Sequence, residues 1–137
     1  MKYFYIPIAA IILFFTACKE NHDTHQGSPD NHIETGELQI TLNDGQKWEL
    51  DDHTQMMFKA MTERVDAGGD INAVGKGLKS DLDKLIQGCT MTGEAHNQLH
   101  AFLTPFIPAV QKLSTNGSAE SLKTVEELLQ KYPKYFE

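Results

Sequence analysis

The residues of this chain that could do chemistry gather in one stretch, from Cys89 to His100. It holds the Cys89 thiol, the Met91 thioether and the imidazoles of His96 and His100. Sulfur and imidazole ligands favour copper, above all Cu(I), whereas magnesium and calcium need several oxygen ligands. A cysteine with two histidines also makes three of the four ligands of a tetrahedral zinc site. The pattern Cys-x-Met-x4-His-x3-His therefore predicts a soft-metal site, with copper preferred to zinc.

The same stretch has a second, structural interpretation. Two histidines four residues apart often lie on a solvated helix face, and a lone cysteine is often buried. The chain would then be a non-catalytic interaction or structural protein with no metal site. Catalysis is not expected: a Cys–His pair could provide a nucleophile, but no oxyanion-hole loop, orienting acid or glycine-rich phosphate loop accompanies it.

The N-terminal residues have the pattern of a lipoprotein signal peptide. A positively charged start precedes an apolar run at residues 6–14 that is too short to span a bilayer. Small residues then precede a cysteine in Phe15-Thr16-Ala17-Cys18. We expect residues 1–17 to be removed and Cys18 to be acylated. Lys19 after the cysteine is typical of Gram-negative lipoproteins sorted to the outer membrane, so we expect a lipid anchor there, with the domain in the periplasm or on the surface.

Charge and cysteine content narrow the possible partners. The formal net charge is −7, and cleavage of the signal peptide would remove one lysine and so make the charge one unit more negative. A protein this acidic is not expected to bind nucleic acid, nor to bind anionic lipid through its charge. Membrane attachment is therefore expected to depend on the lipid on Cys18. Cys18 and Cys89 are the two cysteines, and lipidation of the first leaves Cys89 without a disulfide partner. The expected partners are the membrane and a metal-transport or other envelope protein.

Residues 18–37 are polar and contain glycine, serine and proline, which predicts a flexible tether. Its three histidines (His22, His25 and His32) could bind metal, but the favoured interpretation is that they are solvent-exposed residues with no such role. Residues 38–137 are predicted to form the folded domain. In residues 38–50, apolar residues alternate around an Asn-Asp-Gly turn, which indicates a short β-hairpin or an extended arm whose Trp48 docks on helices.

Four segments with helical periodicity follow: residues 51–67, residues 70–88, a segment from Thr92 to the Asn116-Gly117 turn, and one from Ser118 to about Tyr132. Gly75 and Gly77 weaken the first half of the second segment, and Pro105 and Pro108 predict a bend in the third. The fourth should stop near Tyr132, because a residue before proline avoids helical geometry.

Short connections make an antiparallel up-down four-helix bundle the expected all-α fold, with a looser three-helix arrangement as the alternative. In that bundle the start of the first helix, the loop into the third and the end of the fourth share one end. Met57 thereby joins the predicted metal ligands. The expected neighbours at this end are His53, Met56, Met57, Cys89, Met91, His96 and Tyr132.

The helix order over residues 50–136, closing on Tyr132-Pro133-Lys134-Tyr135, resembles the layout of soluble four-helix-bundle cytochromes b. Those cytochromes bind haem between a methionine on the first helix and a histidine on the last. Met57 matches the first ligand, but the fourth segment has no histidine and the chain has no Cys-x-x-Cys-His motif, so no haem is expected. The segment from Trp48 to His100 resembles small uncharacterised Gram-negative bacterial lipoproteins, a resemblance that implies no activity.

Overall fold

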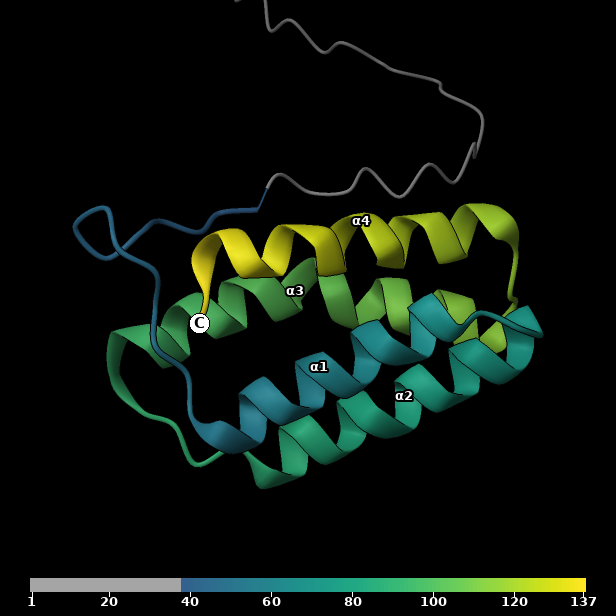
Figure 1. The fold of residues 1–137 in the computed structure, drawn as a ribbon, viewed down its shortest axis with the longest axis horizontal. Coiled ribbons are helices and arrows are strands. Elements are labelled where there is room, and N and C mark those ends of the chain that lie inside the picture. Colours follow the sequence, from purple (N-terminus) through teal and green to yellow (C-terminus); the bar gives the residue numbers. More distant parts are fainter. Residues whose placement is uncertain (1–37) are drawn as a thin grey trace, which may run out of the picture. The chain divides into compact units, whose positions relative to one another are not determined.

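The computed structural model describes residues 38–137, which contain four α-helices and no β-strand (Figure 1). This confirms the predicted all-helical class. The predicted signal peptide, the predicted tether and Cys18 lie outside the described residues. Within the described range, no helix has the length and apolarity needed to cross a bilayer. The helices are α1 (Asp52–Ala67), α2 (Ile71–Gly88), α3 (Gly93–Thr115) and α4 (Ala119–Tyr135).

Local side-chain hydrogen bonds set three of the four helix starts. Asp51 accepts from the backbone N–H of Thr54 at 2.8 Å, and Asp70 accepts in the same way from Ala73 at 2.9 Å. Ser118 caps α4 in a reciprocal capping box with the residue three positions on. Such caps satisfy backbone donors that the first helical turn leaves unpaired. Thr92 precedes α3 as predicted, but its side chain makes no capping hydrogen bond.

The apolar stripe of α3 forms the centre of the core. Phe102 and Phe106 on this helix are fully buried, and Phe58 from α1 packs against both rings. α3 packs on α2 and on α4, and α1 packs on α2, whereas α1 and α4 contact each other much less (Figure 1). The seven buried residues of α3 are Leu99, Phe102, Leu103, Phe106, Ala109, Val110 and Leu113.

Two helices are longer or more regular than the sequence predicts. α2 is helical from its first turn despite Gly75 and Gly77, and α4 continues through Pro133 to Tyr135. The predicted stop near Tyr132 is therefore wrong. Beyond it the chain stays packed, because Phe136 is buried against the core and its N–H donates to the Tyr132 carbonyl at 3.2 Å. Tertiary packing here outweighs the local preference of the residue before proline.

The two glycines of α2 mark places where other groups come close. A Cβ at Gly75 would lie 2.5 Å from the Leu113 carbonyl oxygen of α3, and one at Gly77 would lie 2.6 Å from a guanidinium nitrogen of Arg64. Arg64 donates two hydrogen bonds, of 2.8 and 2.7 Å, to the same carboxylate oxygen of buried Asp81. Gly77 thus leaves room for the ion pair that joins α1 to α2.

The segment before α1 is attached to the C-terminal residues. The backbone N–H of Trp48 donates to the Tyr135 carbonyl at 2.8 Å, and the backbone N–H of Glu137 donates to the Trp48 carbonyl at 3.0 Å. Trp48 is half-buried and packs against the core, as predicted. Asn43 and Gln46 exchange two backbone hydrogen bonds of 2.9 Å around a tight turn, but this pair is isolated and no strand extends from it.

Candidate functional site

His96 and His100 lie on successive turns near the start of α3, and their rings meet. The two Nε2 atoms are 2.9 Å apart, so one ring donates a hydrogen bond to the other. His96 is half-buried and His100 is exposed, which leaves the pair open to solvent on one side. Two nitrogens that bind one tetrahedral ion at about 2.0–2.1 Å are about 3.3 Å apart. The pair is thus close to the spacing of two ligands of one ion, while the present hydrogen bond aims one nitrogen at the other.

The two sulfur residues lie in the loop that leads into this helix. Cys89 directly follows α2, is half-buried against the core and is a free thiol. Met91 is also half-buried, and its sulfur lies 3.7 Å from the Thr54 hydroxyl near the start of α1. The loop thus brings a thiol and a thioether to the edge of the core, ahead of the histidine pair in sequence.

A carboxylate ties this loop to α1. Asp51 accepts from the backbone N–H of Thr54 and, at 3.5 Å, from the hydroxyl of Thr90 in the loop. The hydrogen bonds from Thr54 are the main cause that lowers the pKa of Asp51, which keeps it ionised. The start of α1 also contacts the last turns of α2: the Nε2 atom of His53 lies 3.1 Å from the Lys84 carbonyl oxygen.

The predicted ligands are only partly assembled. His96 and His100 are in contact, Met91 lies against Thr54 on α1, and Met57 is half-buried against the core on that helix. Among residues 38–137, no three His, Cys, Asp or Glu side chains gather around a point that could hold a metal ion. The histidine pair is therefore the part of the predicted site that the fold brings together, with Cys89 close to it in sequence.

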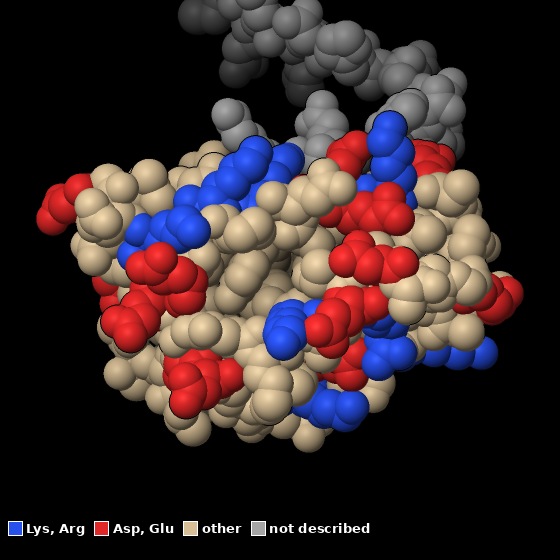
Figure 2. All heavy atoms as spheres, viewed as in Figure 1, with Lys and Arg blue, Asp and Glu red and all other residues tan. Residues whose placement is uncertain are grey.

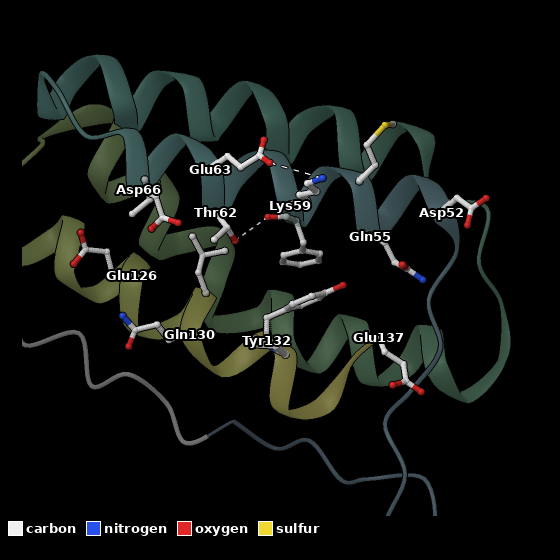
Figure 3. A pocket seen from close by; sticks show the side chains of 15 residues that line it. Asp52, Gln55, Lys59, Thr62, Glu63, Asp66, Glu126, Gln130, Tyr132 and Glu137 are labelled. Atoms are coloured by element: carbon white, nitrogen blue, oxygen red, sulfur yellow. Dashed lines mark hydrogen bonds and ion pairs between the residues drawn. The ribbon is translucent and has the colours of Figure 1, made fainter.

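A groove between α1 and α4 was not anticipated from the sequence. It has a volume of about 1110 Å³ and appears as a hollow floored by uncharged residues (Figure 2). In its floor the Tyr132 ring stacks on Phe58 with centroids 4.0 Å apart, and burial raises the pKa of Tyr132 to about 12 (Figure 3). The apolar periodicity of each helix was visible in the sequence, but the separation of α1 from α4 was not, since it depends on how all four helices pack.

Comparison of the chain with protein-family models, with curated proteins and with solved structures found no match.

Proposed function

We propose that this chain is a lipid-anchored protein of the cell envelope that binds a soft metal ion, with copper preferred, at the start of α3. The observation that supports it best is the 2.9 Å separation of the His96 and His100 Nε2 atoms, next to a loop that carries a thiol and a thioether. Imidazole and soft sulfur together favour copper over hard cations. The protein would hold the ion without turning over a substrate, and would exchange it with a metal-transport or other envelope protein.

The proposal includes an antiparallel up-down arrangement of the four helices, preceded by residues 38–50 as a hairpin-like arm. Consecutive helices make the most extensive contacts, and three or four residues separate each helix from the next, which supports this topology. The contacts of Thr54 with Met91 and of Asp51 with Thr90 are consistent with the start of α1 lying beside the loop that precedes α3.

In the proposed site His96 and His100 supply two ligands and Cys89 a third, as thiolate. Met91 completes the site through its thioether, and Met57 is the other methionine within the predicted set. Metal binding requires a deprotonated thiol and neutral imidazoles, so protons compete with the ion. Affinity should therefore fall as the pH is lowered. The alternative is an interaction or structural lipoprotein with no metal site. In it Cys89 would only pack against the core, and the two histidines would only be surface or packing residues of α3.

A competition titration with Cu(I) tests this site. The mature chain should carry Cys18→Ser and Asn in place of His22, His25 and His32, because the tether could otherwise bind metal itself. We expect one Cu(I) per chain, with affinity at least tenfold weaker in Cys89→Ser and in His96→Ala. Met56→Ala is the matched control, since this thioether is on α1 but is 56% exposed and outside the proposed ligand set. Equal affinity in all four proteins would leave only the structural alternative.

The lipid anchor is tested separately by changing Cys18. We expect the wild-type protein to fractionate with outer membranes and Cys18→Ala to appear in the soluble fraction, because the acyl chains provide the attachment. Mass spectrometry of the wild-type N-terminal peptide should show diacylglycerol on the cysteine. Cys89→Ala serves as the control and should stay with the membrane. Identical fractionation of wild type and Cys18→Ala would rule out the anchor.

A further inference from the structure

The groove between α1 and α4 is long and is built from both helices. Its lining on α1 extends from Asp52 to Asp66, and its lining on α4 extends from Glu126 to Pro133. At a rise of 1.5 Å per residue, the α1 side is about 21 Å long, which is close to four helical turns. Its volume of about 1110 Å³ is near the upper end of the usual range of ligand pockets, about 300–1,000 Å³. The length of the α1 side, and not the volume, therefore favours an elongated ligand such as a helix.

The floor of the groove is apolar and includes an exposed anchor point. Phe58 and Leu129 are buried beneath it, and Tyr132 lies half-buried over Phe58. Met56 lines the groove with a side chain that is 56% exposed, although it is apolar. Methionine adapts its shape to different partners, and apolar grooves of this kind accept the apolar face of a helix.

The rim of the groove is strongly acidic. Lys59 is the one basic residue in the lining, and its ammonium group lies 3.9 Å from a carboxylate oxygen of Glu63. In Figure 3, Asp66 and Glu126 lie on α1 and α4, at one end of the space between them. The apolar floor is thus bordered by five carboxylates and one lysine. The acidic lining residues are Asp52, Glu63, Asp66, Glu126 and Glu137.

We propose that this groove binds one basic amphipathic helix of a partner protein. Leucine-like side chains of that helix would fill the floor, and lysine or arginine side chains along its edges would meet the carboxylates of the rim. A second copy of this chain fits poorly, since its net charge is −7. Residues 18–37 also fit poorly, since they carry five acidic residues and one lysine. Charge complementarity therefore selects a cationic partner.

This inference does not depend on the metal site. Neither His96, His100, Cys89 nor Met91 lines the groove. Loss of copper binding would leave the groove unchanged, and loss of helix binding would leave the copper site unchanged.

A model peptide can test the groove with the full mature chain carrying Cys18→Ser. The probe is a fluorescein-labelled 14-residue peptide with leucine at positions i, i+3, i+4 and i+7 and lysine elsewhere, measured by anisotropy at physiological salt. We expect saturable one-to-one binding. The variant Asp66→Lys with Glu126→Lys should weaken it at least tenfold, because it places two positive charges on the rim. A peptide with alanine for leucine should bind at least tenfold more weakly as well.

The control must separate a docking site from general attraction between an acidic protein and a cationic peptide. Asp44→Lys with Asp83→Lys makes the same change in net charge outside the groove lining and should weaken binding less than threefold. Circular dichroism should show that both double variants remain folded. Equal weakening by the two double variants, equal binding of the alanine peptide, or absence of saturable binding would each overturn the proposal.

Discussion

Replacing Phe102 by alanine is expected to lower the free energy of unfolding by about 3 to 5 kcal/mol, the usual range for removal of a fully buried aromatic ring. The Phe102 ring lies 5.5 Å from the rings of Phe58 and Phe106 and 5.9 Å from those of Tyr132 and Phe136, measured between centroids. It therefore joins α1, α3, α4 and the C-terminal residues. Its removal would leave a cavity, because the neighbouring rings relax only partly around it.

Urea unfolding monitored by circular dichroism measures this decrease in the free energy of unfolding. Phe102→Leu keeps much of the volume and should cost about 1 to 2 kcal/mol, so an effect can be measured even if the alanine variant does not fold. Ile107→Ala is the matched control on the same helix, because Ile107 is 37% exposed. It should cost less than about 1 kcal/mol, in proportion to the smaller apolar area that it buries. A similar loss in Phe102→Ala and Ile107→Ala would contradict the described core.

Replacing Gly75 by alanine should destabilise the protein by about 1 to 3 kcal/mol, although alanine is the better helix former by up to about 1 kcal/mol. The new Cβ would lie 2.5 Å from the Leu113 carbonyl oxygen, 2.8 Å from its carbonyl carbon and 3.0 Å from the Ser114 Cα. All three are backbone atoms, so relief requires α2 and α3 to move apart. The cost of that movement outweighs the gain in helix propensity.

A control on the same helix makes the sign of this effect informative. Ser80 is exposed on α2, and Ser80→Ala should stabilise the protein by about 0.5 kcal/mol through helix propensity alone. Both variants should be compared by urea unfolding under identical conditions. A stabilised Gly75→Ala protein would mean that α2 and α3 do not approach as closely as described.

Local rules explain why the helices could be predicted from the sequence. Asp70 and Ser118 form their caps with N–H groups three residues away, and the apolar stripe of α3 follows its own period. Such signals depend on residues within one or two turns, so no knowledge of packing is needed to recognise them. The i, i+4 spacing likewise placed His96 and His100 on one face, where their rings meet.

Other features depended on contacts between residues far apart in the chain. Gly75 was predicted to weaken α2, yet it is where that helix approaches Leu113, and α4 passes the predicted stop at Tyr132 because Phe136 is buried beyond it. The groove arises in the same way, from the small contact between α1 and α4. The helices and the candidate ligands could thus be predicted from the sequence pattern. The helix spacing and the groove followed from packing, because long-range contacts, not local propensity, set the distances between helices.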